Sequence, residues 1–245
     1  MADEAQRDAP RPITRRESHD KVMALIETLP RGDILDAQCG EGALAERLRD
    51  AGFRVRCCDI DPGLMKAQGL ESKPVDLNTG RIEYDDGAFD YVASTNGLHR
   101  LYNIDNALQE FARVLRPAGK VIISIPNYST IVRRMRFLLT GAVAKNIVRH
   151  EFKQVTGAPQ AHFRQPLGLP RLRSALEASG FAIESITKAR TQKRALWLSP
   201  IALAVKLVAP LVYRRDRALY GLDLANSPVV LLGGHHVIVI AAKVR

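Results

Sequence analysis

The sequence predicts an α/β fold, a doubly wound and mostly parallel sheet of seven strands with helices on both faces and a helical cap or insertion. Three observations lead to this prediction. Short apolar, β-rich segments alternate along the chain with amphipathic helical patterns. A turn with two glycines joins the first strand to the helix that follows it. The fifth strand is almost entirely apolar, as expected when helices cover both faces of a parallel strand. Strands joined by helices in this way imply right-handed crossovers.

The alternation begins near the N-terminus. A helix is expected at residues 18–29, where apolar side chains share one side, and a Pro-Arg-Gly turn ends it before the first strand, 33–37. The next helix, 41–51, stops at Gly52, because a glycine commonly ends a helix. The second strand, 54–58, follows directly.

The pattern continues to the middle of the chain. A short helix is expected at 62–68 and a third strand at 73–77. The fourth strand, 89–95, follows an acidic loop. Helix 104–115 repeats apolar residues at helical spacing and ends at a Pro-Ala-Gly turn before the fifth strand, 121–125.

The second half completes the sheet. Residues 169–179 form the expected helix, closed by Gly180, and residues 181–188 form the sixth strand. The last strand, 235–244, alternates apolar residues. Seven strands within 245 residues suit one α/β domain with a small appended element.

Three segments lie outside that core. Residues 1–17 are polar, carry two prolines and are expected to form a flexible N-terminal arm before a single domain at 18–245. Export is not expected, because this arm lacks a charged-then-apolar leader. Residues 129–166 are basic and weakly periodic, which predicts a cap over the carboxyl edge of the sheet. An apolar helical insertion is expected at about 195–227.

The run 195–213 is the most apolar part of that insertion. Pro200, Pro210 and Lys206 argue against a clean membrane-spanning helix, whereas basic flanks favour a position on an anionic membrane surface. The run is therefore interpreted as an interfacial hairpin or an apolar lid. A buried helical pair or a homodimer interface explains it equally well.

Charge is divided unevenly along the chain. Residues 1–112 hold 14 Lys and Arg against 21 Asp and Glu, a net charge of −7, and residues 113–245 hold 22 against 5, a net charge of +17. The basic half favours an anionic partner such as RNA, a phosphorylated substrate or an acidic membrane surface. A basic proteome or an acidic partner subunit would also account for it.

The cysteines and histidines exclude several other classes. Cys39, Cys57 and Cys58 cannot all pair, and they lack the spacing of a metal site, so they are interpreted as reduced cytosolic thiols. The sequence therefore predicts no metal site. No Ser/His/Asp order supports a hydrolase.

The turn Asp36-Ala37-Gln38-Cys39-Gly40-Glu41-Gly42 is the most informative segment. It follows an apolar strand and opens a helix, so its glycines let the backbone approach a ligand. Asp59 ends the next strand, about 20 residues after the turn, where an acid can accept the hydroxyls of a ribose. Together they predict an adenosine-containing cofactor.

Five motifs in order resemble the class I S-adenosylmethionine (SAM) dependent methyltransferases of the small-molecule type. The family's glycine motif is similar to residues 34–42, and its ribose acid matches Asp59. The later motifs are its adenine-edge acid, its fourth-strand pattern and its Leu-x-Pro-Gly-Gly signature, which match Asp76, residues 89–99 and residues 115–120. The resemblance covers about residues 33–127 well, and residues 162–187 and the final strand more loosely. It implies a Rossmann-like fold, SAM as cofactor and methyltransferase activity.

The resemblance also implies roles for individual residues. The expected cofactor-binding residues are Asp36, Gln38, Gly40, Gly42, Asp59, Ile60, Asp76, Leu77, Thr95 and Asn96. Glycine N–H groups would face the cofactor carboxylate, and Asp36 would orient the methionine ammonium. Each role has a structural alternative. The acids can be ordinary turn or cap residues, and Ile60 can be a core residue. Thr95 and Asn96 can serve only to hydrogen-bond the backbone of their loop.

His99 is the catalytic candidate. Methyl transfer from SAM needs alignment, and it needs a base only when the acceptor loses a proton, which a histidine can take at neutral pH. The alternative is a helix-start histidine bonded to backbone. On the cap side Asn127, His162 and Arg164 are the predicted substrate contacts.

Gln38 departs from the family pattern, which has glycine there. The side chain adds bulk and, if the backbone needs a positive φ, strain. It can turn outward or bond the cofactor carboxylate. Weak SAM binding, or a catalytically silent subunit, therefore remains an alternative.

The acceptor is expected to be a small molecule or a lipid-linked molecule, an anionic one included, for a cytoplasmic enzyme that is free or peripheral to the membrane. An RNA methyltransferase using the basic half is the alternative, although no aromatic platform interleaves the basic cluster. Fold alone does not choose among acceptors.

Overall fold

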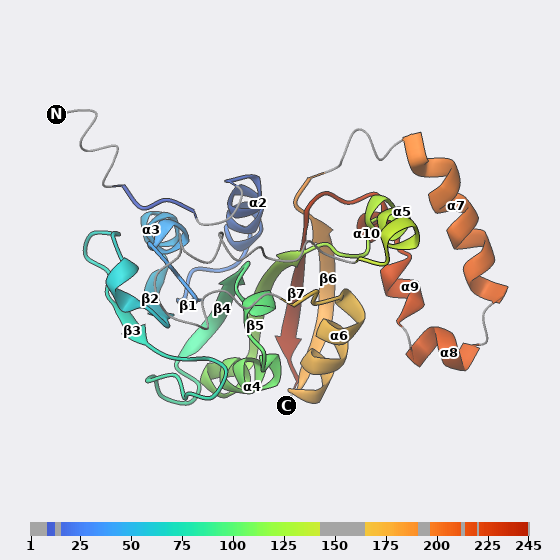
Figure 1. Ribbon diagram of the computed structural model, residues 1–245. Coiled ribbons are helices and arrows are strands. Elements are labelled where there is room, and N and C mark those ends of the chain that lie inside the picture. Colours follow the sequence, from blue (N-terminus) through green and yellow to red (C-terminus); the bar gives the residue numbers. More distant parts are fainter. Residues whose placement is uncertain are drawn as a thin grey trace.

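One mixed sheet forms the centre of the molecule in the computed structural model (Figure 1). The structure describes residues 9–12, 16–142, 165–190, 197–211, 214–219 and 221–244. Within them seven strands lie in the order β3-β2-β1-β4-β5-β7-β6. Their bounds are β1 Asp33–Ala37, β2 Arg54–Asp59, β3 Ser72–Pro74, β4 Phe89–Thr95, β5 Leu115–Pro126, β6 Phe181–Lys188 and β7 His236–Lys243.

The strand directions confirm the predicted mostly parallel, doubly wound sheet. Strands β1 to β5 pair in parallel, and β7 alone runs antiparallel between β5 and β6. Strand order reverses between β1 and β4, so the chain leaves these neighbours toward opposite faces. In an open α/β sheet the crevice at such a reversal, beyond the carboxyl ends of the strands, is where ligands bind.

Two apolar cores separate the sheet from its helices. Helices α2 (Arg16–Ile26) and α3 (Ala43–Asp50) pack on one face with Ile34, Ile122 and Ile238. Helices α4 (Ile104–Val114) and α6 (Leu169–Ala178) cover the other face, as Figure 1 shows. Successive residues of each central strand alternate between the two cores, since strand side chains point to opposite faces in turn.

Several predicted boundaries are wrong by a few residues. The helix expected at 62–68 is only the 3-10 turn η1 (Pro62–Leu64), capped by the Asp61 carboxylate. The third strand ends at Pro74, because proline has no N–H to extend the ladder and the chain then turns at Asp76. Strand β5 begins at Leu115, six residues before the expected start, with a bulge opposite β4.

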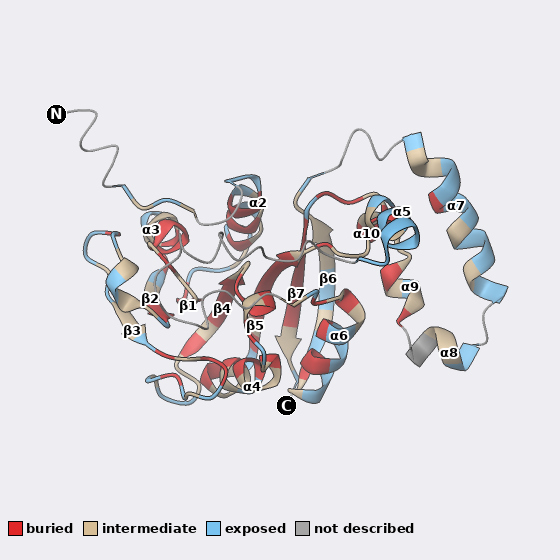
Figure 2. Cartoon of the chain, in the orientation of Figure 1, coloured by how far each residue is buried: buried red, intermediate tan, exposed pale blue. Residues whose placement is uncertain are grey.

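The remaining helices cluster at one end of the sheet, beyond β6 in Figure 1. They are α5 (Ile131–Thr140), α7 (Ser199–Val208), the 3-10 turn η6 (Ala209–Leu211), α8 (Arg214–Leu219), α9 (Leu222–Ala225) and α10 (Pro228–Leu231). Of these, α7, η6, α8 and α9 lie within residues 195–227, where the helical insertion is predicted, and α10 follows that range. Most of α7 is exposed, so the interpretation as a buried helical pair is wrong (Figure 2).

The structure describes two of the predicted segments only in part. Most of the N-terminal arm lies outside the described residues, and α2 begins inside its expected range, at Arg16. Of the basic cap, residues 143–164 lie outside the description. None of the helices in the described ranges is long and apolar enough to cross a bilayer.

Candidate functional site

The predicted cofactor residues converge at the carboxyl edge of β1, β2 and β4. The glycine turn leaves β1 and lies along the end of β2, where the N–H groups of Gln38 and Cys39 both donate to the carbonyl of Cys58, at 2.8 and 3.3 Å. Gly40 N–H donates to Asp59 Oδ2 at 2.8 Å. The turn and the acid predicted to bind ribose therefore form one hydrogen-bonded unit.

Gly42 caps the N-terminus of α3 in a left-handed conformation, with φ of 84°. A Cβ at this position would lie 2.5 Å from Met65 Sδ and 2.8 Å from the Ala67 Cβ. Real Cβ atoms do not approach other atoms so closely. The glycine is therefore required both by its backbone conformation and by the close packing of the loop after η1.

Gln38 also has a left-handed backbone, with φ of 63°. Its side chain turns inward, because Oε1 accepts a hydrogen bond from Ser94 Oγ at 2.8 Å. The amide also lies directly against Gly97, where a Cβ would collide with it. The glutamine side chain thus joins the turn after β1 to the end of β4. The expectation that this side chain turns outward is therefore wrong.

Asp36 is the most perturbed acid of the site. It is buried at the end of β1 with 2 % exposure. Desolvation, with the negative charge of Asp59 as the second cause, raises its pKa from 3.8 to about 8. Its Oδ2 has no hydrogen-bond partner among the described residues. A buried carboxylate oxygen without a partner is well placed to receive a cationic ligand group.

Asp59 lies opposite, at the end of β2. Its second oxygen accepts a hydrogen bond from Asp61 N–H at 3.1 Å, so backbone donors hold both oxygens in place. The next residue, Ile60, is 45 % exposed. An isoleucine this exposed is not a core residue, so that alternative is wrong. Its side chain lies next to the acid predicted to bind ribose, where it is exposed enough to cover the face of a flat ligand.

The loop after β3 is fastened to the loop after β4 by Asn78. Its Oδ1 accepts hydrogen bonds from the N–H groups of Tyr102 and Asn103, at 2.9 and 3.1 Å. Asp76 Oδ1 in turn accepts from the Asn78 side chain at 2.8 Å, and Leu77 is buried. This clamp orients Asp76 and Leu77, and the sequence analysis missed Asn78 because nothing local marks a long-range partner.

Three further polar atoms at this edge are buried without a partner among the described residues. They are Thr95 Oγ1, Asn96 Oδ1 and Ser124 Oγ. Thr95 and Ser124 are register partners on β4 and β5, and Asn96 has a left-handed φ of 60°. Ser124 was missed, although one serine in an otherwise apolar strand was the available signal. Since buried polar groups are normally satisfied, these atoms with Asp36 Oδ2 mark a place for a polar ligand or water.

The proposed catalytic and substrate residues lie in different surroundings. His99 is buried in the 3-10 turn η2 (Leu98–Arg100), and its carbonyl accepts from Gln165 N–H at 2.8 Å. Asn127 is also buried; it donates to the Val230 carbonyl and accepts from Ser129 N–H, at 2.8 and 3.1 Å. His162 and Arg164 lie outside the described residues.

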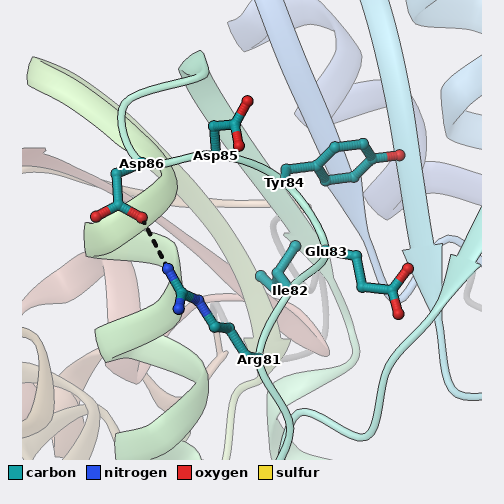
Figure 3. A pocket seen from close by; sticks show the side chains of 6 residues that line it. All are labelled: Arg81, Ile82, Glu83, Tyr84, Asp85 and Asp86. Carbon is teal, nitrogen blue, oxygen red and sulfur yellow. Dashed lines mark hydrogen bonds and ion pairs between the residues drawn. The ribbon is translucent and has the colours of Figure 1, made fainter.

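A surface hollow lies away from these residues, at the opposite edge of the sheet. It measures about 510 Å³ and is formed by the loop that leads into β4, residues 81–86 (Figure 3). Arg81 pairs with Asp86 there at 3.2 Å. The hollow contains none of the predicted site residues and lies at the amino end of β4. It therefore does not change the assignment of the site to the carboxyl edge.

No group of three or more metal-ligand side chains occurs in the part of the chain that the structure describes. The three cysteines are unpaired. Cys57 is buried, and the pKa of its thiol is raised by a hydrogen bond with Cys39 and by desolvation. Such a thiol is protonated and unreactive at neutral pH.

Comparison with known proteins agrees with this geometry. Residues 35–123 match the family described as "Methyltransferase domain". A curated relative, the demethylmenaquinone methyltransferase of Corynebacterium urealyticum, is 28 % identical over 127 residues, which are 49 % of this chain and 55 % of the relative. That of Bacillus cereus is 28 % identical over 123 residues, 46 % of this chain and 52 % of the relative. The chain thus spans about half the length of the curated relatives it matches.

The fold as a whole is shared more widely. A SAM-dependent methyltransferase from Archaeoglobus fulgidus superimposes with a TM-score of 0.56 at 16 % identity, covering 92 % of this chain and 94 % of that one. At this identity the likeness concerns the fold, and it confirms the predicted sheet and its helical layers.

Proposed function

We propose, from the premise that this chain contains a class I SAM-dependent methyltransferase domain, that it transfers a methyl group from SAM to a small-molecule or lipid-linked acceptor. The observation that carries the proposal is the set of buried polar atoms without partners at the carboxyl edge. Asp36 Oδ2 lies near the end of β1, beside the glycine turn, and Thr95 Oγ1 and Asn96 Oδ1 lie at the end of β4. The strand order reverses between these two strands. They suit a ligand that brings both positive charge and hydrogen-bond donors.

The residues present fit SAM. Its ammonium and sulfonium groups are cationic, and the site supplies two carboxylates, Asp36 and Asp59, at neighbouring strand ends. We assign the ammonium to Asp36, because its free oxygen is buried and its pKa is raised in the absence of a cation. Asp59 is assigned to the ribose, since backbone donors already fix its orientation.

The adenine is assigned to the side of the site near β3. Ile60 offers an exposed apolar face, and the clamp at Asn78 presents Asp76 and Leu77. The glycine turn, with Gln38 held by Ser94, forms the floor under the methionine part. When bound, the cofactor supplies an electrophilic methyl group, so the protein's task is to align the acceptor and exclude water.

His99 is the proposed proton acceptor for an acceptor group that ionises as it is methylated. It follows β4 directly, at the edge that holds the cofactor residues, and its burial keeps water away from it. Replacement by asparagine should lower the transfer rate and remove an acid limb from its pH profile, with the affinity for SAM unchanged.

The acceptor is proposed to be apolar. The curated relatives are named for action on demethylmenaquinone, and the chain exposes apolar helices beside the carboxyl edge. A short-chain analogue of demethylmenaquinone in its reduced form is thus the first acceptor to assay, with an RNA transcript as the comparison. Methylation of the RNA alone would favour the alternative acceptor class.

Calorimetric titration with SAM tests the cofactor assignment. Wild-type protein should bind, and Asp59→Asn should weaken binding by about tenfold or more, as expected for a lost charged hydrogen bond of about 1.5 kcal/mol or more. Asp61→Asn is the matched control, because it keeps the side-chain oxygen that caps Gly63 and should change affinity by less than about twofold.

The same titration separates the alternatives. No binding by folded wild-type protein would contradict the proposal. Binding without transfer to any acceptor would instead support the silent-subunit alternative.

A further inference from the structure

Two helices outside the two cores present apolar side chains to solvent. Helix α7 with the turn η6 and helix α5 both lie at the β6 end of the molecule (Figure 1). In Figure 2 almost all of α7, and all of α5 beyond its first turn and a half, is coloured as exposed or intermediate. We call the exposed apolar residues of these elements, together with Trp197 just before α7, the docking surface. They are Val132, Met135, Phe137, Leu138, Leu139, Trp197, Ile201, Leu203, Leu207, Val208 and Leu211.

On α7 and η6 the apolar residues form a stripe. Leu203 and Leu207 are four residues apart on α7, so they lie on one side of the helix, and Leu211 follows in η6. Their exposed fractions are 57, 67 and 81 %. Among the residues of α7 only Ala202 is buried. A helix with so little buried surface is not stabilised by packing against the rest of the molecule, which indicates that its apolar side is meant for another partner.

Helix α5 repeats this arrangement near the site. It starts five residues after β5 ends, so it stands at the carboxyl edge of the sheet. Val132, Met135 and Leu139 recur at helical spacing, and Leu138 is 85 % exposed. Arg134 anchors the helix through hydrogen bonds to the Asn226 side chain and the Ala225 carbonyl, each 2.6 Å long. The exposed leucines therefore belong to an ordered element.

The charge around the docking surface is predominantly positive. Between residues 185 and 215 the sequence has seven Lys and Arg and no Asp or Glu. Lys206, Arg214 and Arg215 are exposed beside or beyond the stripe, as is Arg136 on α5. No carboxylate of the described residues is recorded in an ion pair with any of the four.

We propose that the docking surface binds the face of an anionic lipid bilayer. Apolar side chains bordered by Lys and Arg are the combination that places a helix in the plane of the headgroup region. Trp197, 89 % exposed before the first turn of α7, is the residue type that favours this region. None of the described helices is long and apolar enough to span a bilayer.

A bilayer explains these observations better than a second protein does. The core of a protein interface is typically depleted in charged residues, whereas each basic residue near an anionic membrane adds attraction. The inference does not depend on methyl transfer, since it concerns only binding. If the proposed function also holds, a lipid-linked acceptor would reach the carboxyl edge from the membrane without crossing water.

Vesicle flotation of the full chain tests the inference. Wild-type protein should float with vesicles containing phosphatidylglycerol, with a partition coefficient about tenfold or more above that for phosphatidylcholine alone. The double variant Leu203→Glu/Leu207→Glu should lose about tenfold or more of the binding, because two charges would enter the apolar side. Val244→Glu, on another exposed apolar residue, should keep wild-type binding.

Size-exclusion chromatography and SAM titration of the same proteins complete the design. Equal recovery of wild type and double variant in the soluble fraction overturns the inference. A wild-type dimer that the double variant dissociates, without vesicle binding, overturns it in favour of a second copy. Unchanged SAM affinity in the double variant shows that this variant is folded. Failure of the wild type to bind SAM would contradict the proposed function and leave the membrane inference intact.

Discussion

Gln38 is the residue at which this chain departs most clearly from the glycine motif of the family that it resembles. Its left-handed backbone would suit glycine, yet its side chain bonds Ser94 and packs on Gly97. Strain in the backbone is thus offset by a tie between β1 and β4, and the turn is held in one conformation.

Substitutions at Gln38 separate these two effects. Gln38→Ala should lower the free energy of unfolding by about 1 kcal/mol through the lost hydrogen bond. Gln38→Gly loses the same bond but relieves the left-handed backbone, so it should be more stable than the alanine variant by about 1 kcal/mol. Urea denaturation measures both. An alanine variant as stable as the glycine variant would show that the backbone is not strained.

Asp36 makes stability depend on pH. Its pKa is 3.8 as a free group and about 8 in the folded protein, so the folded state holds the proton more tightly. Its contribution is fully present below about pH 4 and is lost as pH rises to about pH 8. The free energy of unfolding should therefore fall with rising pH across this window, by at most about 1.4 kcal/mol per unit. Asp36→Asn should flatten the curve.

Binding of a cation to Asp36 should release its proton. SAM affinity of wild type should then increase as pH rises toward the raised pKa, and calorimetry in two buffers of different ionisation enthalpy should detect proton release. Asp36→Asn should release none. Identical proton counts for the two proteins would remove Asp36 from the ammonium site.

The element that joins β1 to α3 depends on Gly42. An added methyl group would meet both a left-handed backbone and the side chains of Met65 and Ala67. Gly42→Ala should lower the free energy of unfolding by about 2 kcal/mol or more. Gly87→Ala is the matched control, with φ of 65° and no atom near the new Cβ, and should lower it by only about 1 kcal/mol. Chemical denaturation compares them, and equal losses would mean that the close packing is unimportant.

The loops after β3 and β4 form a second such element. Removing the Asn78 side chain would leave the N–H groups of Tyr102 and Asn103 without their acceptor. Asn78→Ala should lower the free energy of unfolding by about 2 kcal/mol or more and weaken SAM binding, because Asp76 loses its orienting partner. Thr79→Ala, the exposed neighbour, should change neither by a measurable amount.

Acidic and basic residues are concentrated in different halves of the chain. The acidic N-terminal half carries most residues of the proposed cofactor site, and the basic C-terminal half carries the proposed docking surface. Binding to anionic vesicles should therefore fall several-fold as salt rises from about 0.05 to about 0.5 M, because the screening length shortens severalfold. The affinity for SAM should depend far less on salt, because the contacts proposed for SAM are buried. Vesicle binding that is independent of salt would contradict the proposed attraction between the basic residues and the anionic bilayer.

Much of this arrangement can be predicted from the sequence alone. Alternating apolar patterns determine the seven strands and the helices α2, α3, α4 and α6, because local periodicity decides which side of an element is buried. The order of motifs resembles that of the class I SAM-dependent methyltransferases, and residues 35–123 match the family described as "Methyltransferase domain". The motifs also place Asp36 and Asp59 at the ends of the first two strands, and the structure makes those strands neighbours.

Only the tertiary structure decides the rest. The inward direction of Gln38, the clamp at Asn78 and the buried Ser124 depend on partners far away in the chain, which local periodicity does not encode. The same holds for α7, whose apolar sequence suits a buried or an exposed helix equally well. Burial is a property of the packed molecule, and the fold leaves this helix exposed beside its basic neighbours.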